Sequence, residues 1–320
     1  MSHFSGPSFC VKNLGGYLLP MTQRNVALLV NPTSGKGRGG KNAPIAVDRL
    51  RERGLIVSEI IGGSAEESAA LARAAVREGA DALIACGGDG TIHQAVQAVA
   101  ETDVPLGIIP LGTGDDNART LGLPLGDIAA AADVIADGRT RSVDLGHMTL
   151  ADGTSEYFLA VLSIGFDSDV NEKANEMTWP HGQARYLRAI IATLKGFKPA
   201  TFTMTLDDEH RVTDAMLISF GNGVSYGGGM KVCPNAKLDD GLLDVTELGA
   251  VSTFTFLKSF PSVFKGTHTK FPFVTTHRIK KAYVDAPGQI AYADGERLGP
   301  VPVEIEVRPL ALRVLAPVHG

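Results

Sequence analysis

The sequence is short of cysteine, of long apolar runs and of net charge, and each shortage excludes a class of protein. Only three of the 320 residues are cysteines, and they stand far apart at positions 10, 86 and 233. Their number and spacing provide neither a disulfide framework nor a metal site, which favours a reducing compartment and predicts a cytoplasmic protein. No apolar run is long enough to cross a bilayer.

Charge is limited as well, since 30 Lys and Arg residues against 35 Asp and Glu residues give a net charge of −5 at pH 7. This balance argues against broad electrostatic attraction to nucleic acid and leaves room only for a local basic patch. Hydrophobic residues make up 44% and charged residues 20%, which is typical of a globular protein with a sizeable core. The length predicts two domains or one large one.

The first 23 residues carry scattered Gly, Pro and Ser, but neither the basic segment nor the long apolar segment of a signal peptide. They also stand outside the periodic pattern that begins at residue 24. We expect residues 1–23 to form a loosely ordered leader.

The strongest local pattern lies at residues 82–99. An apolar run over residues 82–86 predicts a buried strand, Gly87-Gly88-Asp89-Gly90-Thr91 follows it, and apolar residues at helical spacing come next. Such a layout binds phosphate, because bare backbone amides and the helix dipole favour an anion. A carboxylate beside phosphate needs a cation between them, so Asp89 is a candidate Mg²⁺-linked or catalytic acid. The alternative is a plain tight turn in which Asp89 caps the helix.

Two more glycine-rich segments, 31–40 and 110–119, follow predicted strands at residues 26–30 and 104–111. In the first, Val30 and Gly37 stand where a Walker A loop needs Gly and Ser or Thr, so it is not a Walker loop. It is either a phosphate-contacting loop or a plain surface loop. With a strand at residues 55–61 and helices at 43–53, 66–78 and 125–137, the alternation predicts a doubly wound α/β domain over residues 24–142, with a binding crevice at its strand ends.

The pattern changes after residue 142. Short strands between turns predict an antiparallel β-sandwich over residues 143–309, with strands at residues 141–150, 157–163, 201–206, 212–220, 242–248, 277–284, 289–293 and 303–307. The last apolar run, within residues 310–318, is expected to return to the first domain. Residues 184–194 form a helical stripe, and the aromatic-rich residues 254–264 serve either core packing or a lipid-proximal surface. We expect the glycine-rich residues 225–229 to line the cleft between the domains, and His93 and His181 to be ordinary surface or helix residues.

Five motifs in this order resemble the diacylglycerol kinase catalytic-domain family, which is related to sphingosine and ceramide kinases. They are NPTSGKG at residues 31–37, GGDGT at 87–91, PLGTGDDNAR at 110–119, LDDGLLDV at 238–245 and DGE at 294–296. GGDGT by itself is also found in NAD kinases and phosphofructokinases. The resemblance runs from about residue 24 to the C-terminus, and implies that ATP binds in a cleft between an α/β domain and a β-sandwich domain.

The resemblance also assigns roles to residues of this sequence. Asp89 and Asp116 match acids linked to Mg-ATP, Asp144 matches a further acid of that network, and Glu296 matches the proposed general base. Lys237, Asp240 and Leu242 match a second Mg²⁺ site made of the Asp240 carboxylate and two flanking carbonyls, which are hard oxygen ligands. The nucleotide-contacting positions match Asn31, Pro32, Thr33, Ser34, Gly35, Gly87, Gly88, Asp89, Gly90, Thr91 and Thr113.

Two positions depart from the family pattern. The family usually has Asn-Asp-Phe where this chain has Asp115-Asp116-Asn117, which adds a negative charge and removes an aromatic ring. A threonine that often contacts the nucleotide is replaced by Gly62, with Ser64 as a substitute nearby. These changes put the nucleotide preference in doubt more than the phosphoryl transfer.

The resemblance implies an ATP- and Mg²⁺-dependent lipid kinase, which would convert diacylglycerol into phosphatidic acid and meet its substrate by reversible association with a membrane surface. It also implies a homodimer through the sandwich domain. One alternative is an NAD kinase-like phosphotransferase, from which Asp294-Gly295-Glu296 separates this chain. Another is a non-catalytic lipid-binding protein on the same fold, which the changes at Asp115 and Asn117 favour and the presence of Asp89 and Glu296 opposes.

Overall fold

The computed structural model describes residues 23–317 apart from 32–33, 178, 180–182 and 195, so the expected leader lies almost wholly outside the described residues, as do Pro32, Thr33 and His181. The N-terminal half is built on four parallel strands in the order β2-β1-β3-β4. Their bounds are β1 (Asn25–Val30), β2 (Ile56–Ile60), β3 (Ala82–Gly87) and β4 (Leu106–Pro110). The runs β3 and β4 are buried throughout, as the centre of a parallel sheet requires.

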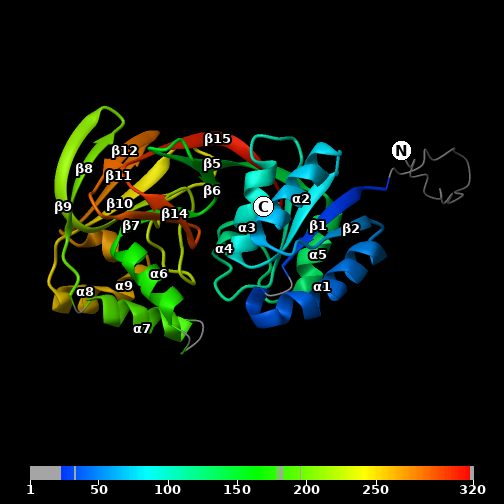
Figure 1. Ribbon diagram of the computed structural model, residues 1–320, viewed down its shortest axis with the longest axis horizontal. Coiled ribbons are helices and arrows are strands. Elements are labelled where there is room, and N and C mark those ends of the chain that lie inside the picture. The colour runs from blue at the N-terminus through cyan, green and yellow to red at the C-terminus, as the bar shows by residue number, and fades with distance from the viewer. Residues whose placement is uncertain (1–22, 32–33, 178, 180–182, 195, 318–320) are drawn as a thin grey trace, which may run out of the picture.

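Helices cover both faces of this parallel sheet, which confirms the predicted doubly wound arrangement (Figure 1). On one face pack α1 (Ser34–Glu52) and α5 (Ile128–Asp137), and on the other α2 (Ala65–Arg77) and α3 (Asp89–Val99). The helix α2 begins where the Ser64 hydroxyl accepts the amide of Glu67, and α5 ends at Gly138, whose left-handed φ of 71° closes the last turn.

The expected loop at residues 31–40 is wrong in extent, because α1 begins at Ser34. The helix therefore follows β1 almost directly, and Gly35 and Lys36 belong to its first turns. Glycine is a poor helix former, but tertiary packing of the apolar face overrides propensity. Ala46, Val47 and Leu50 supply that face and are fully buried against the sheet.

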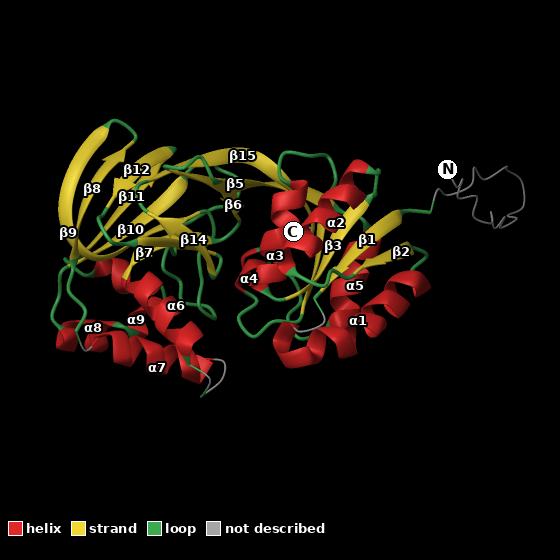
Figure 2. Ribbon diagram, viewed as in Figure 1, coloured by secondary structure: helices red, strands yellow, loops and turns green. Residues whose placement is uncertain are grey.

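The C-terminal half is an antiparallel β-sandwich-like domain with a helical layer along one side (Figure 2). The helices of that layer are α6 (Phe166–Glu176), α7 (Gln183–Leu194), α8 (Thr253–Ser259), α9 (Pro261–Phe264) and the short 3₁₀ helix η1 (His268–Lys270). The strands are β5 (Thr140–Leu150), β6 (Ser155–Phe158), β7 (Val161–Gly165), β8 (Ala200–Leu206), β9 (Glu209–Gly221), β10 (Leu243–Gly249), β11 (Val274–Ile279), β12 (Lys281–Asp285), β13 (Ile290–Ala293), β14 (Glu296–Pro300) and β15 (Val303–Leu315).

Two long strands carry the sheet from one half into the other. The strand β15 pairs antiparallel with β5 along most of its length, and Val314 pairs in parallel with Leu106 of β4. Leu312 and Val314 are buried in the core cluster that contains α3 and β4. The last apolar run of the chain is thus part of the N-terminal core, and the strands of both halves form one hydrogen-bonded network.

Several predicted strands have different limits in the structure. The runs 303–307 and 311–315 are one strand, β15, which is irregular between Arg308 and Leu312. The run 157–163 is two strands, β6 and β7, because the amides between them bond the Asp294 carboxylate instead of a neighbouring strand. The run 277–284 likewise divides into β11 and β12. The helix α6 and the short helix α4 (Asp116–Thr120) were not predicted.

Candidate active site

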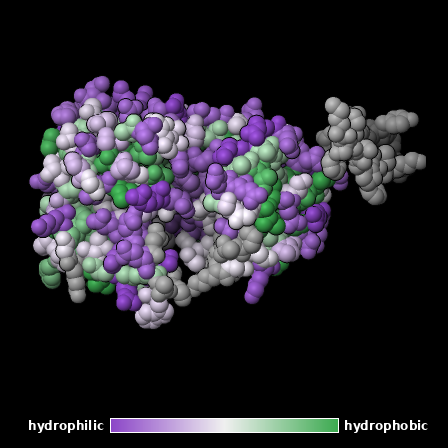
Figure 3. All heavy atoms as spheres, in the orientation of Figure 1, coloured by the Kyte–Doolittle hydropathy of each residue, from purple (hydrophilic) through white to green (hydrophobic). Residues whose placement is uncertain are grey.

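A polar cleft of about 290 Å³ separates the two halves, and residues from both halves line it. Figure 3 shows the surface hollowed between the halves, with hydrophilic residues around the hollow. The N-terminal half contributes the ends of β3 and β4 with the turns that follow them, which is where a doubly wound sheet places its ligands. The C-terminal half contributes the segment after β9, helices α6 and α7, and the turn between β13 and β14. Residues that matter below are Asp89, Gly90, Thr113, Gly114, Asp116, Tyr226, Gly227, Gly228, Asp294 and Glu296.

The glycine turns after β3 and β4 touch each other through their backbones. Gly88 is the extended N-cap of α3, and a Cβ placed on Gly112 would lie 3.0 Å from the Gly88 Cα. A Cβ on Gly87 would overlap the side chain of Thr91, which is itself buried. Side chains are therefore excluded where the two turns meet, and what remains is backbone and the N-terminus of α3, a surface suited to an anion.

Asp89 and Asp116 bring two carboxylates to the same side of Gly114. A Cβ on Gly114 would lie 3.1 Å from Asp89 Oδ2 and 3.3 Å from Asp116 Oδ2. Burial is the main cause that raises the pKa of Asp89 to about 7, with a smaller contribution from the charges of Asp116 and Asp115, and the hydrogen bond from the Asn117 amide opposes the rise. Burial also raises the pKa of Asp116. Two carboxylates this close together in the cleft favour a cation between them.

Asp116 also connects the halves. Its carboxylate accepts the backbone amides of Gly228 at 2.6 Å and Gly229 at 2.9 Å, and lies 3.7 Å from the Arg119 guanidinium. The segment that it holds contains Tyr226, Gly227 and Gly228, which line the cleft as predicted. The Tyr226 hydroxyl donates a hydrogen bond to Asp167, whose pKa burial raises to about 7.

Glu296 reaches the cleft from the start of β14 and lies directly against the glycine turn of the other half. A Cβ on Gly90 would lie 2.5 Å from Glu296 Oε1. The turn that carries Glu296 is fixed by Asp294, whose buried carboxylate accepts the amides of Leu159, Ala160 and Val161 at 2.8 to 3.2 Å. Asp89 and Glu296, predicted from distant parts of the sequence, thus line one cleft.

His93 is not the ordinary surface or helix residue that was expected. It is buried on α3, with its Nε2 2.7 Å from Glu156 Oε2 and its Nδ1 3.9 Å from Asp294 Oδ2. Burial by itself would lower its pKa, but the hydrogen bonds and negative charge of Asp294 and Glu156 outweigh burial and raise the pKa to about 9. The imidazole of His93 therefore joins the glycine-turn helix to β6 and to the β13–β14 turn of the C-terminal half.

The oxygen donors of Asp89 and Asp116 fit Mg²⁺, because this ion prefers carboxylates together with waters and substrate phosphates rather than an all-protein cage. Within residues 23–317 as described, no group of three or more His, Cys, Asp and Glu side chains is placed to hold a metal by itself. Thr113 lines the cleft. Of the other matched positions, Asn31 directly follows β1, and Ser34 and Gly35 begin α1.

The remaining metal candidates lie together at another place, between β9 and β10. Asp240 forms an ion pair with Arg278 and accepts the Leu242 amide, and Lys237 is exposed nearby. Asp144 is fully buried, and its two oxygens accept the amides of Gly241 at 2.7 Å and Leu310 at 2.7 Å. Asp144 thus anchors the segment around Asp240 to β5 and β15.

The departure from the family pattern at residues 115–117 has a local explanation. The extra carboxylate, Asp115, adopts a left-handed φ of 50° as the N-cap of α4 and accepts the Gly112 amide at 2.8 Å. Asn117 is buried under the cleft, and its amide bonds Asp89. The side chain of Asp115 therefore braces its own turn.

Comparison with known proteins agrees with this geometry. The family model described as the diacylglycerol kinase catalytic domain matches residues 25–148, and the model described as the YegS C-terminal NAD kinase beta sandwich-like domain matches residues 160–316. The chain is 47% identical over 296 residues to a diacylglycerol kinase of Mycobacterium tuberculosis (strain ATCC 25618 / H37Rv), covering 92% of this chain and 96% of that relative. It is 30% identical over 286 residues to a diacylglycerol kinase of Staphylococcus saprophyticus, covering 88% and 91%.

A solved structure from Bacillus anthracis str. Sterne, assigned as a diacylglycerol kinase, superposes with a TM-score of 0.77 at 26% identity, covering 93% of this chain and 99% of that one. Sequence and structure therefore match over both halves of the chain. The chain belongs to the diacylglycerol kinase catalytic-domain family.

Proposed function

We propose that the protein transfers the γ-phosphoryl group of ATP to the free hydroxyl group of diacylglycerol, which yields phosphatidic acid. The observation that carries the proposal is that Glu296 of one half lies against Gly90 of the other, in a cleft that also holds Asp89 and Asp116. Phosphoryl transfer depends on positioning and charge stabilisation, and both are supplied by parts that meet there.

Each half has a distinct role in this proposal. The backbone of the glycine turns and the N-terminus of α3 bind the phosphates, and Asp89 and Asp116 hold Mg²⁺. When bound, Mg²⁺ neutralises the charge of the phosphates. Asp116 orders the segment at Gly228 and Gly229 so that the cleft is closed from the C-terminal side. Glu296 accepts the proton of the attacking hydroxyl group, and Asp294 fixes its turn.

An apolar pocket beside the cleft supports a lipid acceptor. It has a volume of about 60 Å³ and is lined mainly by aromatic and aliphatic side chains, including Phe166, Phe256, Phe260 and Val263. Tyr226 lines both this pocket and the polar cleft. At this volume the pocket has room only for a short apolar group, so it would receive one end of an acceptor whose hydroxyl group lies in the polar cleft.

The proposal is tested by incubating the purified chain with Mg²⁺, ATP labelled at the γ-phosphate, and diacylglycerol in mixed micelles. Parallel reactions contain a sphingoid base, phosphatidylglycerol or NAD. We expect labelled phosphatidic acid. Glu296→Gln should lower kcat by about 10²–10⁴-fold, the usual contribution of a general base, with little change in the KM for ATP.

Glu304→Gln is the matched control, because Glu304 is exposed on β15 and lies outside the cleft. Its kcat should equal that of the unchanged chain. Transfer to NAD alone would replace the proposal by an NAD kinase-like activity. Tight binding of diacylglycerol without any transfer would identify a lipid-binding protein instead.

A further inference from the structure

Two segments of the C-terminal half contain cations and no acids, although the chain as a whole is acidic. Residues 177–206 include four Lys and Arg residues and no Asp or Glu, and residues 248–284 include six and none. The first segment contains α7, and the second contains α8, α9 and η1. These helices lie side by side along one face of the C-terminal half (Figure 2). The local basic patch that net charge left open is therefore on this face.

The same face carries large apolar side chains in contact with solvent. Phe254 on α8 is 76% exposed and Trp179, just before α7, is 69% exposed. Leu257, Phe264 and Ile191 are also exposed. Phe254, Leu257 and Lys258 are spaced three and four residues apart, so they share one side of α8, with the lysine beside the two apolar residues.

The exposed side chains stand on a rigid base. The opposite side of α8 presents Phe256, which contacts Phe166 with ring centroids 5.0 Å apart and stacks on Phe260 at 5.7 Å. Buried residues of α6, α7 and α8 belong to one apolar cluster. Trp179 is held from the side, because the Arg188 guanidinium lies 5.8 Å from its ring centroid and donates a hydrogen bond to its carbonyl. The solvent exposure of Phe254 is thus not a consequence of poor packing.

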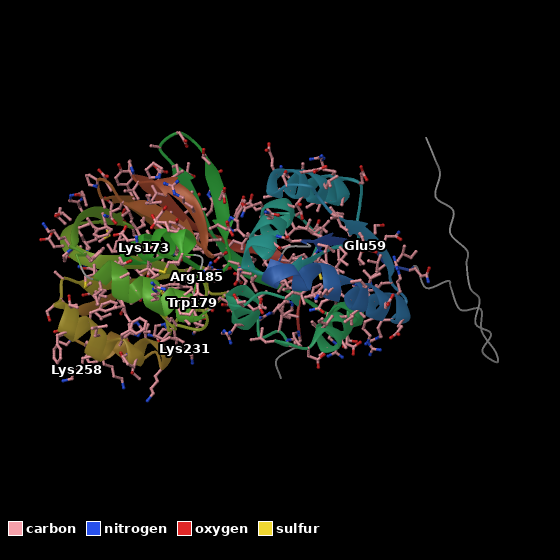
Figure 4. The ribbon with its side chains drawn as sticks, turned by 60° about the horizontal axis from the view of Figure 1, so that its bottom comes forward. Glu59, Lys173, Trp179, Arg185, Lys231 and Lys258 are labelled. Atoms are coloured by element: carbon pink, nitrogen blue, oxygen red, sulfur yellow. The ribbon has the colours of Figure 1, made fainter. Side chains whose placement is uncertain are left out.

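The cations of this face are available to a partner. Within the described part of the chain, Lys231, Lys258 and Lys265 form no ion pair with a carboxylate. The amide of Lys231 bonds the Val263 carbonyl, which places this lysine beside α9. Figure 4 turns this face forward and shows Trp179, Arg185, Lys231 and Lys258 distributed across it.

The face also borders the candidate active site. Arg185 of α7 lines the polar cleft, and Phe256, Phe260 and Val263 line the apolar pocket beneath α8 and α9. A lipid that leaves a surface in contact with α7, α8 and α9 would therefore meet the pocket and then the cleft.

We infer that the outer face of α7, α8 and α9 docks on a bilayer that contains anionic phospholipid. Aromatic side chains enter the interfacial region, and the lysines and arginines around them contact the lipid phosphates, as in other interfacial helices. The inference is linked to the proposed function, because docking would bring a lipid kinase to its substrate in the membrane. It concerns binding and needs neither nucleotide nor diacylglycerol.

The test measures sedimentation of the full-length chain with vesicles of phosphatidylcholine, with and without phosphatidylglycerol, in the absence of nucleotide and diacylglycerol. We expect binding to the anionic vesicles, which weakens as salt screens the charges. Lys258→Glu combined with Lys265→Glu should lower this binding at least about tenfold, because each lysine near an anionic surface contributes roughly fivefold. Phe254→Glu combined with Leu257→Glu should have a comparable effect.

Matched control variants carry the same kinds of substitution, a cation to Glu or an apolar residue to Glu, outside the docking face. Arg73→Glu combined with Arg77→Glu alters exposed cations of α2, and Ile61→Glu alters an exposed apolar residue after β2. These variants should bind as the unchanged chain does. Failure of the unchanged chain to bind anionic vesicles, or an equal loss in the controls, would overturn the inference.

Two further outcomes are informative. If Phe254→Glu with Leu257→Glu converts a dimer into a monomer by light scattering, the face is an interface between copies of the chain and the inference is wrong. If vesicle binding behaves as expected but no diacylglycerol is phosphorylated, the docking face is supported and the proposed reaction is the part that fails.

Discussion

At the scale of single residues, His93 is the least expected member of the site. Its imidazole lies between Glu156 of β6 and Asp294 of the β13–β14 turn, while its own helix carries Asp89 and Gly90. One imidazole thus contacts two acids of the other half, one of which fixes the turn of Glu296. If His93 lost its positive charge, Glu156 and Asp294 would lose their buried partner, and the free energy of unfolding would fall.

The stability of the protein should therefore depend on pH through His93. Its pKa in the folded state, about 9, lies above the ordinary value of 6.5. The stabilisation is fully present below pH 6.5 and is lost as the pH rises through 9. We expect the free energy of unfolding in urea to fall by on the order of 1–3 kcal/mol between pH 6.5 and 9.5. His93→Gln should be less stable at pH 6.5 and should show a much flatter dependence.

The exposed His210 provides the control, and His210→Gln should keep the slope of the unchanged chain. An identical slope in His93→Gln would assign the pH dependence to other groups. Burial raises the pKa of Asp89 and of Asp167 to about 7, inside this window, so these two acids should leave a smaller fall in stability in His93→Gln as well, and burial raises the pKa of the Cys86 and Cys233 thiols to about 12, above the window.

Residues whose place at the cleft follows from a local motif could be predicted, and residues whose place depends on a distant partner could not. Asp89 stands in GGDGT and Glu296 in DGE, so each carries its signal within a few positions. The sequence around His93 does not reveal its partners, because Glu156 and Asp294 lie far along the chain. For Asp144 the sequence indicated an acid of the nucleotide and metal network. It did not indicate that the Asp144 carboxylate accepts hydrogen bonds from the amides of Gly241 and Leu310.

At the scale of elements, the N-terminus of α3 and the start of β14 approach so closely that only a glycine at position 90 leaves the Glu296 side chain where it is. A Cβ at Gly90 would lie 2.5 Å from Glu296 Oε1. In Gly90→Ala the carboxylate must move, since it is the flexible end of a side chain, while alanine favours the helix by about 0.5–1 kcal/mol. We expect unchanged or slightly higher thermal stability and a loss of kcat of more than about tenfold, because small displacements of a catalytic group are costly.

Gly196→Ala is the control, because a Cβ there would meet no atom within 4 Å. Its kcat should not change. If Gly90→Ala kept full activity, Glu296 would not need its observed position against α3, and its role as the base would lose its main structural support.

Elements were predictable where the apolar pattern alone decides them, as in β3, β4 and α2. The ends of a strand could not be predicted where a side chain from a distant part of the chain accepts the backbone amides that would otherwise pair with a neighbouring strand. The Asp294 carboxylate takes the amides of residues 159–161 and so separates β6 from β7. The irregularity in β15 has a similar origin, because the Leu310 amide bonds Asp144 and Leu310 adopts a φ of 52°.

At the scale of the whole molecule, two long strands run from one half into the other and join the halves in one sheet. The strands β5 and β15 pair from Leu150 and Val303 at one end to Thr140 and Leu315 at the other. One end lies in the core of the C-terminal half, and the other packs on β4 in the N-terminal half. The sequence indicated a change of architecture near residue 142, but nothing in its periodicity showed that the same two strands would serve both cores.

This continuity predicts that the halves unfold together. Leu312 of β15 is fully buried in the N-terminal core, so Leu312→Ala should cost about 2–5 kcal/mol of the free energy of unfolding. Hydrogen exchange monitored by mass spectrometry should show the loss of protection equally in β1 and β3 of one half and in β8 and β9 of the other, because a cooperative unit opens as a whole.

Val212→Ala, at a position on β9 that is 63% exposed, should change protection in neither half by more than about 0.5 kcal/mol. Protection lost only within residues 24–142 would mean that the C-terminal half stays folded when the N-terminal core opens. The cleft would then join two independently stable domains, and the contacts of His93, Asp116 and Glu296 across it would be formed by docking rather than by folding of one body. Equal loss in both halves would instead mean that the positions of Asp89 and Glu296 are set in a single step.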